Sequence, residues 1–164
     1  LDGAVAAFDP GENIHRDGIL HTTTVPARLS PGLAQDAVLL AGRILNALDY
    51  VGVIGVELFV TPRGLVVNEI APRVHNSGHW TIDACQVSQF ENHIRAVADW
   101  PLGDAERHSD AEMFNLIGEE VNAWRDLAGD PDVALHIYDK GEAREGRKMG
   151  HWTRLFPRGT RGAA

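Results

Sequence analysis

Two apolar runs separated by a short turn constrain the fold of this chain more than any other feature. The first run covers residues 52–61, the second covers residues 65–70, and Pro62-Arg63-Gly64 between them is a turn sequence. This pattern predicts a β-hairpin. Each run carries one carboxylate, Glu57 in the first and Glu69 in the second. A turn centred near Arg63 brings these two carboxylates opposite each other.

The two opposed carboxylates predict a cation site. A charge inside an apolar strand is costly unless it is paired or bound to a metal. Two carboxylates whose Cβ atoms lie about 4.5–5.5 Å apart repel each other unless a cation lies between them. Oxygen ligands suit Mg²⁺, so Glu57 and Glu69 are candidate metal ligands, with a merely solvated acidic face as the alternative. Asn68 would point to the other face of a regular strand and would join the site only through a bulge.

The loop that follows the second run is rich in polar side chains. Residues 73–80 read Arg-Val-His-Asn-Ser-Gly-His-Trp and combine a guanidinium, two imidazoles, an amide and a hydroxyl. Arg73 suits a carboxylate or phosphate, and His75 and Asn76 suit neutral polar edges, so we expect a small-ligand site. The alternative for Ser77 is a cap on the helix that follows.

The histidines leave two further possibilities open. His75 and His79 have the spacing of zinc ligands on a helix, but a glycine-containing loop is a poor platform and no third ligand is evident. His15 is a lone loop histidine, and by itself it favours an ordinary surface position over a ligand.

A basic turn stands out against the acidic balance of the chain. Residues 140–148 contain four cations and two glycines, whereas the whole chain has a net charge of −8. Lysine and arginine side chains with glycine-flanked N–H groups could receive a phosphate monoester. The alternative is a solvated turn in which Glu142 and Glu145 balance the cations.

Composition excludes several classes of protein. The chain has 164 residues, with 15 Lys and Arg against 23 Asp and Glu, which argues against a nucleic-acid-binding domain. It lacks an apolar run of about 18 residues, and its one cysteine, Cys85, excludes an internal disulfide. The first ten residues have neither a basic start nor a long apolar stretch, so we do not expect them to be a secretory signal. We therefore expect a cytoplasmic protein that binds small molecules, without membrane or nucleic-acid partners. Because it opens on Leu1 and not on Met, we expect a piece of something longer.

The remaining elements mix helices and strands without regular βαβ repeats, which predicts the α+β class. The predicted strands cover residues 3–8, 19–25, 112–117, 133–138 and 149–156. The predicted helices cover residues 30–49, 81–99 and 119–127. The composition becomes polar at residues 105–108, which indicates a boundary between residues 1–104 and residues 105–164.

Three segments together carry a family resemblance. They are residues 13–20, residues 57–81 and residues 146–151, and the run from Asn68 to Thr81, NEIAPRVHNSGHWT, is the most specific. They resemble the N5-carboxyaminoimidazole ribonucleotide synthetases, ATP-grasp enzymes of bacterial and fungal purine synthesis, over residues 4–153. The resemblance implies the C-terminal half of an ATP-grasp domain, an antiparallel sheet with helices, in residues 1–104. It implies a small β-rich C-terminal domain in residues 105–164.

The resemblance also implies an activity. Members of the family join bicarbonate to the exocyclic amine of 5-aminoimidazole ribonucleotide, using ATP and passing through carboxyphosphate, to form N5-carboxyaminoimidazole ribonucleotide. The implied cofactors are ATP and Mg²⁺ or Mn²⁺, and the implied assembly is a homodimer. The lysine-bearing half of the ATP grasp has no counterpart in this sequence, so we expect the chain alone to be inactive.

The family's site residues match positions of this chain. Glu57 and Glu69 would hold the metal, and His15, Asn68 and Glu69 would contact ATP. The substrate-binding set would be Arg73, His75, Asn76, Ser77, Lys140 and Arg147, of which the first three would be catalytic. The family normally has proline where this chain has Glu145, and that charge would weaken the phosphate clamp. Two other functions remain open: another ATP-grasp carboxylate–amine ligase, or a non-catalytic ribonucleotide-binding module.

Overall fold

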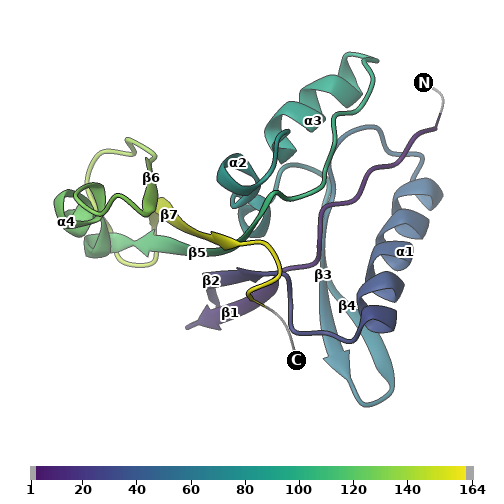
Figure 1. Ribbon diagram of the computed structural model, residues 1–164, viewed down its shortest axis with the longest axis horizontal. Coiled ribbons are helices and arrows are strands. Elements are labelled where there is room, and N and C mark those ends of the chain that lie inside the picture. Colours follow the sequence, from purple (N-terminus) through teal and green to yellow (C-terminus); the bar gives the residue numbers. More distant parts are fainter. Residues whose placement is uncertain (1–2, 162–164) are drawn as a thin grey trace.

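The computed structural model describes residues 3–161, which form two antiparallel sheets with helices around them (Figure 1). The strands are β1 (Glu12–Arg16), β2 (Ile19–Val25), β3 (Gly55–Thr61), β4 (Gly64–Ala71), β5 (Ser109–Ile117), β6 (Val133–Ile137) and β7 (Lys148–Pro157). The helices are α1 (Pro31–Ala47), α2 (Thr81–Ala84), α3 (Gln89–Val97) and α4 (Trp124–Ala128), with two 3₁₀ turns, η1 (Asn76–Gly78) and η2 (Gly118–Ala123). The predicted α+β class is confirmed.

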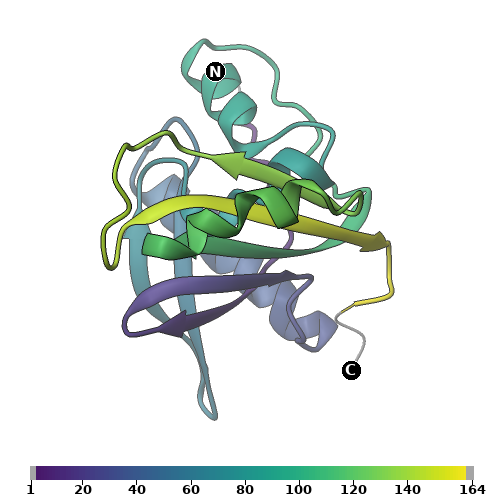
Figure 2. The same cartoon turned by 90° about the vertical axis from the view of Figure 1, so that its left-hand side faces the viewer.

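The larger sheet joins distant parts of the chain. Its strand order is β1-β2-β5-β7-β6, and Thr22 of β2 lies opposite Phe114 of β5. Figure 2 shows these strands running side by side across the molecule. The sheet therefore spans the predicted boundary after residue 104, since β1 and β2 precede it and β5 to β7 follow it. The division into residues 1–104 and 105–164 stays a prediction.

The main core lies where this sheet meets α2. Val25, Ala84, Ala111 and Met113 are fully buried there, and Trp80 is 2% exposed. Burial of large apolar side chains is the main source of folding free energy, so this cluster fixes the loop before α2 against the sheet. In the described part of the chain no helix has both the length and the apolar character to cross a membrane.

Helix α1 begins as its sequence predicts but is only partly covered. Ser30 is the N-cap, its hydroxyl accepting from Leu33 N at 3.3 Å, and a proline follows at the first helical position. Only Ala37 of the helix is buried, and Leu39 remains 54% exposed. The apolar stripe of α1 instead borders a hollow of about 1730 Å³ between this helix, residues 3–13 and the β3–β4 hairpin.

The structure corrects the prediction for the first residues. Residues 3–8 form no strand, and β1 instead lies between the predicted strands 3–8 and 19–25, where the sequence predicts a loop around His15. Strand β1 is at the edge of the sheet, so its charged side chains stay in water and mask the strand pattern. Residues 3–8 are apolar enough for a strand, but no described strand pairs with them, and an unpaired segment is not a stable strand.

The predicted helix over residues 81–99 is in fact two helices. Cys85 is extended and forms a β-bridge with Arg107, which ends α2 after one turn. Ser88 then caps α3, its hydroxyl accepting from Glu91 N at 3.3 Å. The predicted helix over residues 119–127 is likewise divided into the 3₁₀ turn η2 and the short helix α4.

Candidate functional site

The hairpin places its two carboxylates opposite each other, as predicted. Glu57 of β3 pairs with Glu69 of β4, and Leu58 then pairs with Val67, so Asn68 is the extra residue of a β-bulge. The amide Nδ2 of Asn68 donates to Glu57 Oε2 at 3.4 Å. The bulge that Asn68 needs in order to join the carboxylates is therefore present.

The two carboxylates differ in burial. The Glu57 side chain is 11% exposed, whereas that of Glu69 is 52% exposed. The apolar runs predict a buried strand for both carboxylates, and this is wrong for Glu69, because little of the described chain covers its face of the two-stranded hairpin. Phe59 and Val60, each 57% exposed, show that other parts of the hairpin are also uncovered. The cost of burying a charge therefore applies to Glu57 alone.

Strand β1 delivers two side chains to Glu57. Asn13 Nδ2 donates to Glu57 Oε1 at 3.5 Å, and the Asn13 amide is itself oriented by Thr23 Oγ1, which donates to its Oδ1 at 2.9 Å. His15 Nε2 lies 4.0 Å from the same Glu57 oxygen. Sequence reasoning proposed His15 but missed Asn13, although a spacing of two residues puts both on one face of a strand.

His75 reaches the second carboxylate from the polar loop. Its Nε2 lies 3.9 Å from Glu69 Oε1, and its Nδ1 is 2.8 Å from Ser77 Oγ. Burial lowers the pKa of His75, although Glu57 and Glu69 oppose this shift, so the imidazole is neutral at pH 7. A Cβ on Gly55 would lie 2.7 Å from the His75 Cβ, so the close approach of this loop to β3 requires glycine.

Gln89, at the start of α3, holds the backbone of this loop. Its Oε1 accepts from His75 N at 2.9 Å, and its Nε2 donates to His75 O at 2.7 Å. The same Nε2 is 2.9 Å from His79 Nδ1, and burial lowers the pKa of His79 to about 4, so that nitrogen accepts the bond. Gly78 makes room for the amide, since its Cβ would lie 2.7 Å from Gln89 Oε1. Gln89 lies outside the three segments that carry the family resemblance, and the sequence alone gives it no role.

The geometry argues against the zinc alternative and against the cap. His79 faces Gln89 while His75 faces Ser77 and Glu69, and neither histidine belongs to a group of three potential ligands among the described residues. Helix α2 has Trp80 as its N-cap with no side-chain cap bond, so a capping role for Ser77 is wrong.

Asn76 is tied to the larger sheet. Its Nδ2 donates to Asn115 Oδ1 at 2.8 Å, and Asn115 Nδ2 donates back to Asn76 Oδ1 at 2.6 Å. Asn115 is 2% exposed and also donates to Leu20 O at 3.0 Å. This reciprocal pair leaves Asn76 one free N–H.

The basic turn meets the hairpin through Lys148. Burial lowers the pKa of Lys148, and the charges of Glu57 and Glu69 oppose that shift, so the start of β7 lies within electrostatic range of both carboxylates. Lys140 Nζ donates to Lys148 O at 2.9 Å and stands 4.9 Å from the centre of the Tyr138 ring. Sequence reasoning counted Lys148 among the cations of the turn without assigning it a contact.

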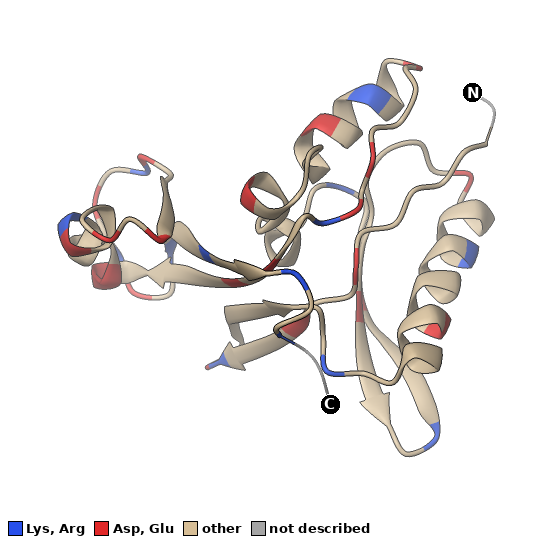
Figure 3. Ribbon diagram, in the orientation of Figure 1, with Lys and Arg blue, Asp and Glu red and all other residues tan. Residues whose placement is uncertain are grey.

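The other two predicted cations are less constrained. Arg73 is exposed, and its Nη1 donates to Val74 O at 3.0 Å. Among the described residues, the Arg147 guanidinium has no hydrogen-bond or ion-pair partner. Figure 3 shows Lys and Arg dispersed over several elements and interspersed with Asp and Glu, an arrangement unlike a basic nucleic-acid-binding face.

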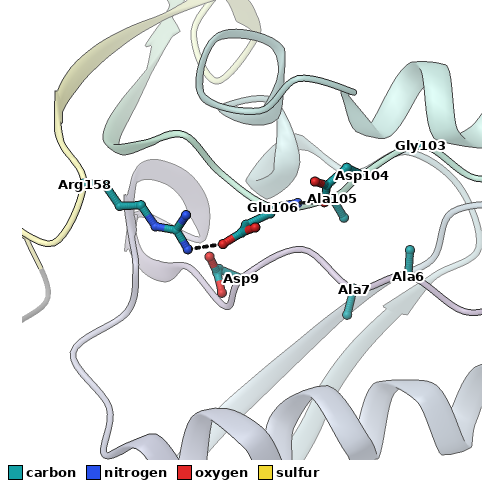
Figure 4. A pocket seen from close by; sticks show the side chains of 8 residues that line it. All are labelled: Ala6, Ala7, Asp9, Gly103, Asp104, Ala105, Glu106 and Arg158. Carbon is teal, nitrogen blue, oxygen red and sulfur yellow. Dashed lines mark hydrogen bonds and ion pairs between the residues drawn. The ribbon is translucent and has the colours of Figure 1, made fainter.

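The large hollow beside α1 opens onto Glu57. Its lining includes Asn13, His15, Glu57, Asn68 and His75, together with apolar residues of α1 and β3. A smaller hollow of about 380 Å³ contains none of these residues. Figure 4 shows this second hollow, where an ion pair joins Arg158 to Glu106 beside Asp9. The large hollow is therefore the candidate ligand pocket.

Comparison with known proteins gives two family matches, one for each part of the chain. The ATP-grasp domain family matches residues 1–90, and the phosphoribosylaminoimidazole carboxylase C-terminal domain matches residues 111–160. The chain is 56% identical over 157 residues to the N5-carboxyaminoimidazole ribonucleotide synthase of Brucella melitensis, covering 95% of this chain and 43% of the relative. The chain thus spans about two fifths of the length of this relative.

Two solved structures of the enzyme from Aspergillus clavatus are also similar. One, complexed with ATP, has a TM-score of 0.90 and 36% sequence identity, and the match covers 95% of this chain and 43% of the solved chain. The other, with ADP and 5-aminoimidazole ribonucleotide, has a TM-score of 0.88 and 37% sequence identity, and the match covers 93% of this chain and 43% of the solved chain. The chain therefore belongs to the N5-carboxyaminoimidazole ribonucleotide synthase family, of which it carries an ATP-grasp segment followed by the C-terminal domain.

Proposed function

We propose that this chain forms one side of the active site that carboxylates 5-aminoimidazole ribonucleotide with bicarbonate and ATP. The observation that carries the proposal is the convergence of β1, the hairpin, the polar loop and the start of β7 on Glu57 and Glu69. Relatives have been solved with ATP and with ADP plus 5-aminoimidazole ribonucleotide, the ligands that such a site would take.

The hairpin would hold the metal that accompanies ATP. Its donor atoms are two opposed carboxylates with an amide beside them, and oxygen donors of this kind fit Mg²⁺, or Mn²⁺ in its place. When bound there, the ion would neutralise charge on the ATP phosphates during phosphoryl transfer. Asn13 and Asn68 would orient Glu57 through their amide contacts, and His15 would contact the nucleotide.

The polar loop would hold the bicarbonate-derived group and the aminoimidazole. Arg73 would offer its exposed guanidinium to a carboxylate or phosphate, which it can bind bidentately. His75, neutral and held by Gln89, would present a polar ring edge next to Glu69. Asn76 would use its remaining N–H, and Ser77 would keep the His75 ring in place. These groups position the reactants, which is the main task of a phosphoryl-transfer site.

The basic turn would bind the ribonucleotide phosphate. The Lys140 ammonium donates to the backbone carbonyl of Lys148. The Arg147 guanidinium has no partner among the described residues, so it can turn toward a ligand. Lys148 would lie between this phosphate and the hairpin carboxylates, so its positive charge would attract both the phosphate and the carboxylates. We further propose that the working protein is a cytoplasmic homodimer, as the resemblance implies.

A chimera tests the activity directly. The matching 43% of the Brucella melitensis relative would be replaced by this chain, and ATP hydrolysis would be measured with and without 5-aminoimidazole ribonucleotide and bicarbonate. We expect hydrolysis that requires both compounds and that is abolished by Glu69→Ala. Arg63→Ala, at the exposed hairpin turn, is the matched control and should leave hydrolysis intact.

Binding to the chain by itself separates the alternatives. We expect weak binding of ATP and of 5-aminoimidazole ribonucleotide in isothermal titration. Micromolar binding of the ribonucleotide without ATP, together with an inactive chimera, would instead favour a non-catalytic binding module. Hydrolysis that depends on a different amine acceptor would favour another ATP-grasp ligase.

A further inference from the structure

Two histidines and an aspartate form a cluster outside the residues assigned above. His136 of β6 lies directly opposite His151 of β7, and their rings stack with centres 4.5 Å apart. Asp83 of α2 approaches with both oxygens, at 3.0 and 3.1 Å from His136 Nε2. One potential ligand atom from each of the three residues lies within 4.8 Å of the other two.

His151 carries a nitrogen with no partner. The residue is 1% exposed, and its Nδ1 is 2.7 Å from the Tyr138 hydroxyl. In the described part of the chain its Nε2 has no hydrogen-bond partner. Buried polar atoms are almost always hydrogen-bonded, so an unpartnered Nε2 in a cluster of potential ligands calls for a bound group.

The contact with Tyr138 favours one tautomer of His151. The Tyr138 hydroxyl oxygen, 2.7 Å from Nδ1, can accept a hydrogen bond from Nδ1–H. That tautomer leaves a lone pair on Nε2. A metal-bound histidine commonly donates its other N–H to an oxygen in this way.

We propose that Asp83, His136 and His151 bind one divalent transition-metal ion, with zinc as the first candidate and water as the fourth ligand. Two nitrogens and one carboxylate oxygen are a common set of protein ligands for zinc, whereas Mg²⁺ favours oxygen alone. Ligands at about 2.0–2.1 Å from a tetrahedral ion lie about 3.3 Å apart, close to the observed 3.0 Å between Asp83 and His136. The two imidazoles are stacked within 15° of parallel, so one ring would have to turn on metal binding for both Nε2 lone pairs to point at the ion.

Such an ion would connect the two family-matched segments. Asp83 belongs to residues 1–90, and both histidines belong to residues 111–160. The ion would therefore fix α2 against β6 and β7, and through α2 the polar loop that precedes it. The inference does not rest on the proposed function, since it concerns stability and metal content alone.

Metal titration of the chain tests the site. The chelator-treated protein would be titrated with zinc chloride and, separately, with cobalt chloride, in excess Mg²⁺ to occupy the oxygen-rich hairpin. We expect one equivalent of zinc by mass spectrometry and the visible absorption bands of tetrahedral Co²⁺. At about 100 times the dissociation constant, zinc should raise the thermal midpoint by about 5–10 °C.

Variants locate the ion. Asp83→Asn keeps the shape of the side chain, and His136→Gln removes an imidazole, so both should lose the zinc equivalent and the rise in midpoint. His108→Gln alters an exposed histidine elsewhere and should retain both, as should Glu69→Gln at the hairpin. Zinc retained by Asp83→Asn and His136→Gln, or lost in Glu69→Gln, would overturn the proposal. Absence of zinc binding in the unaltered chain would show that the cluster is only an ion pair beside a stacked imidazole.

Discussion

Gln89 binds both backbone polar groups of His75, accepting from its N–H at 2.9 Å and donating to its carbonyl at 2.7 Å. Gln89 is 3% exposed, so both bonds are shielded from water. The side-chain amide of Gln89 thus makes the same pair of hydrogen bonds to His75 that a neighbouring β-strand would make, and it fixes the loop that carries the predicted substrate ligands.

Replacing Gln89 should loosen this loop. Gln89→Met keeps the volume but removes both bonds and leaves His75 N–H and C=O unsatisfied, at a cost of about 2–3 kcal/mol in unfolding free energy. Gln89→Glu keeps the acceptor for His75 N–H but cannot donate to His75 O or His79 Nδ1, and it buries a charge, so it should cost at least as much. Urea unfolding and amide hydrogen exchange of residues 75–79 measure the two effects. Gln35→Met, on the exposed face of α1, is the control, and an equal loss there would contradict the assignment.

A methyl group on Gly55 should displace His75. Its Cβ would lie 2.7 Å from the Cβ of His75, so Gly55→Ala should cost about 1–3 kcal/mol and move the His75 ring away from Glu69. The imidazole resonances in an NMR spectrum report this movement. Gly42→Ala is the matched control, because no atom lies within 4 Å of its added Cβ, and in a helix it should stabilise the chain by about 0.5–1 kcal/mol.

Both hairpin carboxylates should be needed for divalent cation binding. We expect Glu57→Gln and Glu69→Gln each to weaken Mn²⁺ binding by roughly tenfold, or about 1.4 kcal/mol, in an electron paramagnetic resonance titration. Glu142→Gln, a carboxylate of the basic turn, should leave the affinity unchanged. Equal affinity in all three variants would place the cation outside the hairpin.

Stability should fall in acid through Asp110. Burial works toward a higher pKa, but the N–H groups of Arg161 and Gly159 outweigh it. The Arg107 guanidinium, 3.0 Å away, adds to their effect, and the pKa of Asp110 lies below its ordinary value. The native state therefore binds the proton of Asp110 more weakly than the unfolded state does. The contribution of ionised Asp110 to the unfolding free energy is complete above the unfolded pKa near 4, and it is lost as pH falls through the pKa of the folded state.

Asp110→Asn isolates that contribution. It should cost about 2–3 kcal/mol at pH 7, because the neutral amide weakens the charge-assisted bonds from Arg107 and from the N–H of Arg161, while Arg107 keeps its ion pair with Asp9. The difference from the unaltered chain should shrink as urea unfolding is repeated at lower pH. A difference that stays constant with pH would assign the loss to packing and not to charge.

The sequence predicts those parts of the site that depend on local pattern. The hairpin follows from two apolar runs around Pro62-Arg63-Gly64, and the pairing of Glu57 with Glu69 follows from their symmetric placement about that turn. The start of α1 follows from Ser30 and Pro31, because an N-cap depends only on residues that are close together in the sequence.

Long-range contacts could not be predicted in this way. The pairing of Asn76 with Asn115 and the approach of Asn13 to Glu57 depend on how the two sheets meet, which no local pattern encodes. The break at Cys85 is similar, because the bridge to Arg107 overrides the helical spacing around it. Strand β1 was missed because an edge strand can be as polar as a loop.

The order of strands in the large sheet has a consequence for synthesis on the ribosome. Strand β2 receives its second neighbour, β5, only after α1, the hairpin, α2 and α3 have all been made. During that interval the nascent chain exposes one edge of β2, together with the apolar side of Val25 that later enters the core. Stalled or truncated products ending before β5 would therefore be the forms most prone to aggregate.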